Sequence, residues 1–95
     1  MENYKKRIKK IIQDNLKDKD KYRLFLFGSR AQGQSIKYSD YDIGIEGQEA
    51  IPYSVLAKIK TALEDSDLPF KVDVVDFFSV DDSFRKEAYN NIKEL

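Results

Sequence analysis

Three acidic residues of this chain have a spacing that suggests chemistry. Asp40 and Asp42 are separated by one residue in "SDYDIGIE", and Asp73 is flanked by valines in "FKVDVVDF". Residues two apart on a strand point the same way, about 7 Å apart at their Cα atoms, so both carboxylates can reach one cation. Two like charges this close repel each other unless a metal neutralises them. Asp40 and Asp42 therefore predict a site for a hard divalent ion, Mg²⁺ or Mn²⁺.

The segment before this pair suggests a partner for the metal. Mg²⁺ takes one or two carboxylates and completes its coordination with water and phosphate oxygens. In "LFLFGSR", Gly28 lets a phosphate approach the backbone, Ser29 offers a hydroxyl and the amides of a helix start, and Arg30 is a further phosphate contact. Residues 28–35 also match a P-loop except that Gln34 replaces the lysine, and we interpret that match as coincidental.

Asp73 is the third candidate ligand. If its strand lies beside the strand of Asp40 and Asp42, three carboxylates can hold two ions, an arrangement that stabilises the attacking and leaving oxygens of a phosphoryl displacement. Asp73 can then also accept the proton of an attacking hydroxyl. The sequence alone leaves another role open, in which Asp73 forms a structural ion pair with Lys71 or Arg85.

Each of the other features also has a simpler explanation. A Gly-Ser turn after a strand is common, an Asp-x-Asp strand can mark a solvated face, and arginines at helix starts are often merely exposed. The combination is what favours a catalytic site. The chain has no cysteine and no histidine, which excludes thiol nucleophiles, disulfides and histidine-based catalysis.

These residues need elements that position them. Apolar spacing predicts an amphipathic helix over about residues 3–18, with Leu16 at the end of its stripe, and later helices from Pro52 to the breaker at residues 66–69 and from an N-cap at Ser79 to the end of the chain. We expect Phe84, Ala88, Ile92 and Leu95 to form the buried stripe of the last helix. Ser29 is expected to cap a short helix to about Gln32.

Strands are expected between these helices. The apolar run at 23–27 predicts a central strand covered on both faces, residues 40–46 a strand with Tyr41, Ile43 and Ile45 on one face, and residues 70–77 a largely buried strand. The order α-β-α-β-α-β-α favours an α/β (α+β) sandwich, a short mixed sheet covered by helices, in one domain over residues 1–95. Without a signal peptide or an apolar membrane span, we expect a soluble, cytoplasmic protein.

The quoted residues resemble those of a known family. Gly28-Ser29, ten residues, and then Asp40-x-Asp42, with Asp73 in "VDVV", look like the minimal nucleotidyltransferases of the DNA polymerase β-like superfamily. The resemblance implies that Gly28 and Ser29 hold the nucleotide phosphates, with Arg30 at the basic position that follows. It also implies that Asp40 and Asp42 bind Mg²⁺ and that Asp73 completes the triad.

The resemblance also implies an activity and a partner. Its members of this size transfer a nucleoside monophosphate, AMP from ATP in some antitoxins, to a hydroxyl such as a tyrosine of a HEPN-type or HEPN-like helical partner toxin. We therefore expect a hetero-oligomer. Two alternatives remain open: a non-catalytic antitoxin that neutralises its partner by contact, and a nucleic-acid binder using the basic front, where residues 1–23 hold nine Lys and Arg against four acids. We interpret that basic run as the solvated face of a helix.

Overall fold

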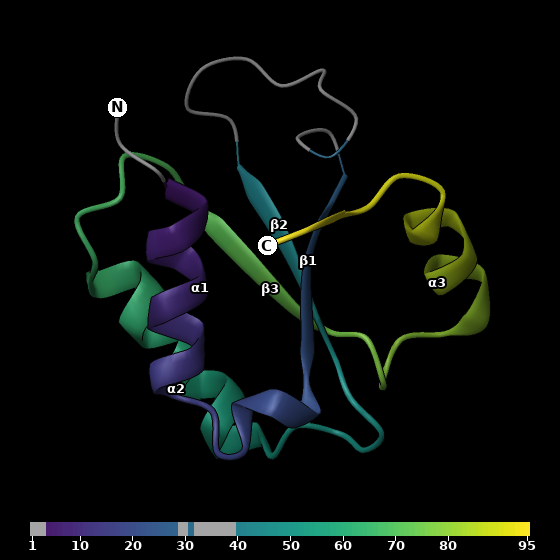
Figure 1. Ribbon diagram of the computed structural model, residues 1–95, viewed down its shortest axis with the longest axis horizontal. Helices are drawn as coiled ribbons and strands as arrows, with labels where there is room; N and C mark the ends of the chain where they lie inside the picture. The colour runs from purple at the N-terminus through teal and green to yellow at the C-terminus, as the bar shows by residue number, and fades with distance from the viewer. Residues whose placement is uncertain (1–3, 29–30, 32–39) are drawn as a thin grey trace.

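The computed structural model describes residues 4–28, 31 and 40–95, which form three layers (Figure 1). Helices α1 (Tyr4–Asp14) and α2 (Tyr53–Asp65) cover one face of a four-stranded sheet, and α3 (Asp82–Tyr89) lies against the other face. The predicted sheet covered by helices is therefore confirmed. No helix in the described part of the chain is long and apolar enough to cross a membrane.

The sheet is mixed, as predicted, and its strand order is β3-β2-β1-β4. β1 pairs antiparallel with β2 and with β4, while β2 and β3 run parallel and are connected through α2. This connection is a crossover of the kind that parallel strands require. The bounds are Arg23–Phe27 for β1, Tyr41–Glu46 for β2, Val72–Asp76 for β3 and Lys93–Glu94 for β4, and a short 3-10 helix, Lys19–Lys21, precedes β1.

The larger core lies between the sheet and the helices α1 and α2. The predicted alternation along β2 is confirmed, because Tyr41, Ile43 and Ile45 are all buried on this face. The isoleucines of α1 and the apolar stripe of α2 pack against them and against β1. Buried residues from the helices are Ile8, Ile12, Ile59 and Leu63.

The smaller core, on the α3 face, is aromatic. Phe25 and Phe27 of β1 meet Phe77 edge to face, with ring centroids 4.7 Å and 5.1 Å from it. Since β1 is thus buried on both faces, the prediction of a central covered strand is confirmed. Gly44 leaves room for this cluster, because a Cβ there would lie 2.5 Å from the Phe25 ring.

The first helix is shorter than predicted. It ends at Asp14 because the Asn15 side chain donates to the Ile11 carbonyl, 2.8 Å away, and because Asp18 adopts a left-handed conformation with φ 53°. Side chains that bond to nearby backbone compete with helix continuation in this way. Leu16 is nevertheless buried, as expected. The expected helix at residues 29–32 falls on a segment of which only Ala31 is described.

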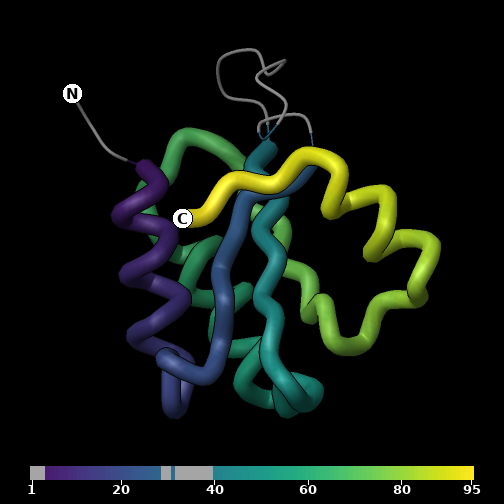
Figure 2. Tube along the Cα trace, turned by 45° about the vertical axis from the view of Figure 1, so that its right-hand side comes forward, coloured from purple at the N-terminus to yellow at the C-terminus, as the bar shows by residue number. Residues whose placement is uncertain are grey.

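The last helix differs most from the prediction. Its N-cap is Asp81, which accepts a hydrogen bond from the Phe84 amide, and the prediction of Ser79 was wrong. The helix ends at Tyr89, so Ile92 and Leu95 are not on it, and the unpredicted strand β4 returns to β1 (Figure 2). Two residues of β4 are too few to produce a recognisable strand pattern in the sequence.

Candidate active site

Asp42 and Asp73 face each other across the parallel pair of strands. The register places Asp42 of β2 directly beside Asp73 of β3, near the end of the sheet where β1 finishes. Both side chains alternate with residues of the larger core, so they project on the α3 face, as does Phe27, the partner of Asp42 on β1. The expectation that these two acids come from neighbouring strands is confirmed.

The electrostatics of Asp42 suit a cation. Burial, followed by the negative charges of Asp73 and Asp40, raises the pKa of the Asp42 carboxyl above its ordinary value. The charged form is thus disfavoured until positive charge arrives. Hard carboxylate oxygens that repel one another are the donor set that Mg²⁺ or Mn²⁺ takes, so these residues fit a divalent ion.

Asp40 lies just outside the strand. β2 begins at Tyr41, one residue later than predicted, and the Tyr41 amide donates to the carbonyl of Lys71, the residue that precedes β3. Asp40 is exposed, yet its charge still reaches Asp42. Within residues 4–28, 31 and 40–95, no three Asp, Glu, His or Cys side chains are grouped closely enough to hold a metal ion. The Asp42–Asp73 pair therefore carries the geometric argument, since Mg²⁺ needs only one or two protein carboxylates.

Gly28 adjoins the Asp42 carboxylate. It follows the last residue of β1 with φ +75°, and a Cβ at this position would lie 2.5 Å from Asp42 Oδ2. Only glycine fits here without strain, both for its conformation and for the space. The sequence predicts a role for Gly28 in phosphate binding, and the structure adds that Gly28 leaves room for the Asp42 carboxylate. Ser29 and Arg30 lie outside the described residues.

Asp73 already has a positively charged neighbour. Lys71 Nζ lies 3.5 Å from Asp73 Oδ1, and the Asp73 side chain is 45% exposed. An ion pair this exposed contributes little to stability. Lys71 instead balances the charge of Asp73 when no other cation is near. The ion pair with Lys71 that the sequence left open is therefore formed, and Asp73 still faces Asp42. Arg85, the other candidate, bonds elsewhere.

A buried acid that the sequence analysis missed lies at the opposite end of the sheet from Asp42 and Asp73, where β2 and β3 finish. The Asp76 carboxylate accepts hydrogen bonds from the Ile51 amide, the Phe78 amide and the Ser79 hydroxyl, at 3.0, 3.1 and 3.0 Å. It ties the loop after β2 to the turn that leads to α3. The second aspartate of "VDVVD", at a position that the alternation of β3 buries, was the available signal.

Comparison with known proteins assigns this chain to a family. Nearly the whole chain, residues 6–95, matches the family model for polymerase beta nucleotidyltransferases, and the chain therefore belongs to this family. The chain is 35% identical over 79 residues to the "Probable protein adenylyltransferase MntA" of Haemophilus influenzae, with 83% of this chain and 67% of that protein covered.

Solved structures show the same fold. A toxin-antitoxin crystal structure with AMP-PNP is similar with a TM-score of 0.77 and 26% identity, over 97% of this chain and 72% of that one. A second, the toxin-antitoxin MntA-HpeT with a tyrosine-to-alanine substitution, has a TM-score of 0.73 and 28% identity, over 100% of this chain and 72% of the other. The expected fold and family are thus confirmed.

Proposed function

We propose that this protein transfers AMP from Mg²⁺-bound ATP to a hydroxyl group of a partner protein. The observation that carries the proposal is the direct opposition of Asp42 and Asp73 on the sheet, beside the glycine turn that ends β1. Similarity to an adenylyltransferase and to a structure with AMP-PNP supports the choice of nucleotide. Similarity to toxin-antitoxin complexes supports a protein partner. The family resemblance described above implies that this partner is a HEPN-type helical toxin and that the acceptor is a tyrosine.

Each residue has a role in this reaction. Asp42 and Asp73, with Asp40 beside them, would hold divalent ions, and these supply charge stabilisation to the phosphates. Gly28, Ser29 and Arg30 would hold the phosphates themselves. The acceptor oxygen forms a bond to the α-phosphorus as the bond to the β-phosphate oxygen breaks, and pyrophosphate leaves.

In this proposal Asp73 receives the proton of the acceptor hydroxyl. Its carboxylate is partly exposed, so a hydroxyl from outside can reach it, whereas Asp42 is more enclosed beside Gly28. Lys71, within 3.5 Å, would move away from Asp73 or share it as the ion and the acceptor arrive. The contribution of the protein is then positioning and electrostatics, with no covalent intermediate.

The test is direct transfer of label. The protein is incubated with its partner, α-labelled ATP and Mg²⁺, and we expect labelled partner with the wild type and a loss of at least about 100-fold with Asp42→Asn. Asp20→Asn makes the same chemical change at an exposed position of the 3-10 helix and serves as the matched control. Undiminished labelling with Asp42→Asn would refute the proposal.

A second assay, which measures neutralisation of the partner, distinguishes the contact-only antitoxin. If the partner is neutralised equally well by the protein carrying both Asp40→Asn and Asp42→Asn, binding alone accounts for the function. Nucleic-acid binding through the basic front is a weaker alternative, and any such binding must fall steeply with added salt.

A further inference from the structure

A pocket lies beside the candidate active site, between α3 and the end of β1. It has a volume of 290 Å³ and is lined by Phe27, Gly28, Phe84, Glu87, Ala88 and Asn91. The pocket adjoins Asp42 because Gly28 lines it and packs directly against the Asp42 carboxylate. Its size, just below the range of about 300–1,000 Å³ typical of small-molecule sites, suits one ring system rather than a whole nucleotide.

The lining of this pocket suits a flat heteroaromatic ring. Phe84 contacts Phe27 and Phe77 edge-on or tilted, with ring centroids 6.0 Å and 5.7 Å away, and still leaves 41% of its surface exposed. Glu87 of α3 and Asn91, which follows the end of that helix, add a carboxylate and an amide to the apolar wall. No hydrogen bond or ion pair engages either of these two side chains in the part of the chain that the structure describes.

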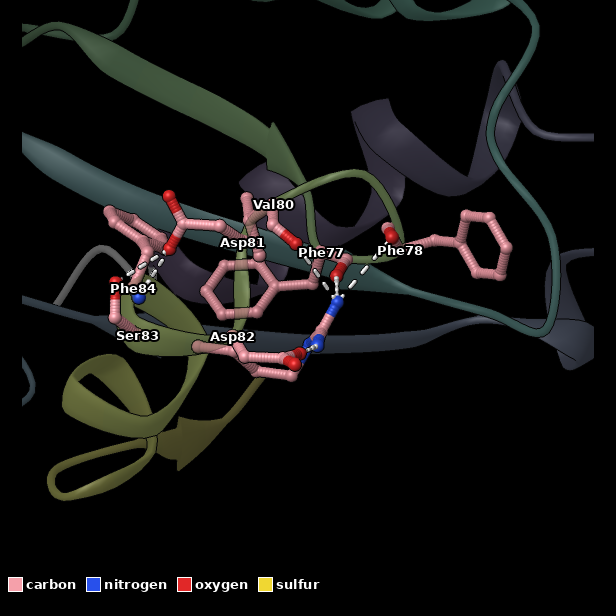
Figure 3. Close-up of polar contacts among 8 residues, drawn as sticks. Phe77, Phe78, Val80, Asp81, Asp82, Ser83 and Phe84 are labelled. Carbon is pink, nitrogen blue, oxygen red and sulfur yellow. Dashed lines mark hydrogen bonds and ion pairs between the residues drawn. The ribbon is translucent and has the colours of Figure 1, made fainter.

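The aromatic wall is held in place before any ligand arrives. The Arg85 guanidinium donates to the carbonyls of Phe77 and Val80, at 2.9 Å and 3.1 Å, and pairs with Asp82 (Figure 3). The Asp81 carboxylate caps the same helix by accepting from the Phe84 amide (Figure 3). Phe84 thus lies between two anchored neighbours at the start of α3, and a preorganised wall reduces the cost of binding.

We propose that this pocket binds the purine base of the nucleotide, with Phe84 as the stacking surface and Asn91 as the group that selects adenine. The proposal rests on the proposed function, since the base enters this pocket while the phosphates lie beside Asp42. Aromatic side chains stack on bases, and an asparagine amide pairs with adenine through one donor and one acceptor. The Glu87 carboxylate can accept from the exocyclic amine, and its negative charge keeps phosphates out of the pocket.

Binding measurements on the full chain test the proposal without relying on transfer. Isothermal titration with Mg²⁺-ATP should show about tenfold weaker binding for Phe84→Ala, while binding of Mg²⁺-tripolyphosphate, which has no base, stays unchanged. Asn91→Ala should reduce the preference for ATP over GTP about tenfold. Phe78→Ala and Asn90→Ala are the matched controls, since both residues are exposed neighbours that do not line the pocket.

Retention of the ring supplies a control for folding. Phe84→Tyr keeps the stacking surface and should bind ATP within about twofold of the wild type, so it separates loss of stacking from loss of structure. Unchanged ATP affinity in both Phe84→Ala and Asn91→Ala overturns the proposal. Equal losses for ATP and tripolyphosphate, or no ATP binding by the wild type, overturn it as well.

The outcomes also separate this inference from the proposed function. ATP binding that depends on Phe84, without any labelling of the partner, would support the base pocket and reject the transfer reaction. Labelling that requires Asp42 but keeps its nucleotide preference in both pocket variants would support the transfer reaction and reject the base pocket. Loss of partner binding at unchanged ATP affinity would show that this aromatic surface contacts the partner, and would also overturn the inference.

Discussion

Replacing Gly28 with alanine tests whether this glycine leaves room for the Asp42 carboxylate. The added Cβ would lie 2.5 Å from Asp42 Oδ2, whereas ordinary van der Waals contact begins near 3.4 Å, so the oxygen must move by about 0.9 Å. The carboxylate is at the end of a short side chain and can rotate away. The substitution therefore displaces a proposed metal ligand while leaving the core intact.

The Gly28→Ala substitution is expected to lower both the stability and the rate of transfer. An alanine at φ +75° costs about 1–2 kcal/mol because its Cβ crowds the following carbonyl oxygen. For a chain of this length, that loss lowers the melting temperature by about 4–16 °C. Misplacement of a catalytic group by about 1 Å reduces the rate about 100-fold. We therefore expect a moderately destabilised protein that transfers AMP at about 1% of the wild-type rate.

The assay compares initial rates of partner labelling at a temperature where every variant is folded. Gly47→Ala is the matched control, because its Cβ would lie 2.7 Å from the Tyr22 ring, away from the acidic pair. That variant should lose stability and keep its activity. If Gly28→Ala transfers AMP within about twofold of the wild type, the steric link between Gly28 and Asp42 has no functional consequence and the reasoning is wrong.

Three further outcomes follow from the carboxylates. Because the pKa of Asp42 is raised, the folded protein without divalent ions loses stability as the pH rises above 3.8, and Asp42→Asn should melt at a higher temperature at neutral pH in calorimetry. Asp76→Ala leaves the buried Ile51 amide and a second amide unpaired and should cost about 3 kcal/mol in urea denaturation; a loss below about 1 kcal/mol would contradict its supporting role. The hydrogen bond from the Phe84 amide lowers the pKa of Asp81, so the cap stabilises α3 above the ordinary pKa and is lost as the pH falls through the lowered value; acid titration followed by circular dichroism should show this helix loss in the wild type and not in Asp81→Ala.

Much of the fold could be predicted because local patterns decide it. The alternation of Tyr41, Ile43 and Ile45 fixed one face of β2, and the helical spacing of Ile8 and Ile12 fixed the buried side of α1. Where the prediction failed, the decisive contacts were specific side-chain bonds. The Asn15 amide ends α1 early, and Asp81 rather than Ser79 caps α3 because the Ser79 hydroxyl bonds to Asp76.

The candidate active site could also be predicted only in part. The spacing of Asp40 and Asp42 and the position of Asp73 between valines pointed to these acidic residues. A charge in a largely apolar strand costs free energy unless it is paired or binds a metal. The strand order could not be read from the sequence, since it depends on how the α2 connection returns to the sheet. The pocket beside α3 was missed because Phe84 was assigned to the buried stripe, whereas the structure leaves 41% of it exposed.

The parallel pairing of β2 with β3 has a consequence for how activity arises during folding. Asp42 and Asp73 are about 30 positions apart in the chain and meet only after the whole α2 segment has formed and returned. Contacts of such separation form slowly, because the intervening chain must be ordered first. Recovery of catalysis after dilution from denaturant should therefore lag behind recovery of helix signal, and enzymatic turnover becomes a kinetic probe of the pairing of β2 with β3.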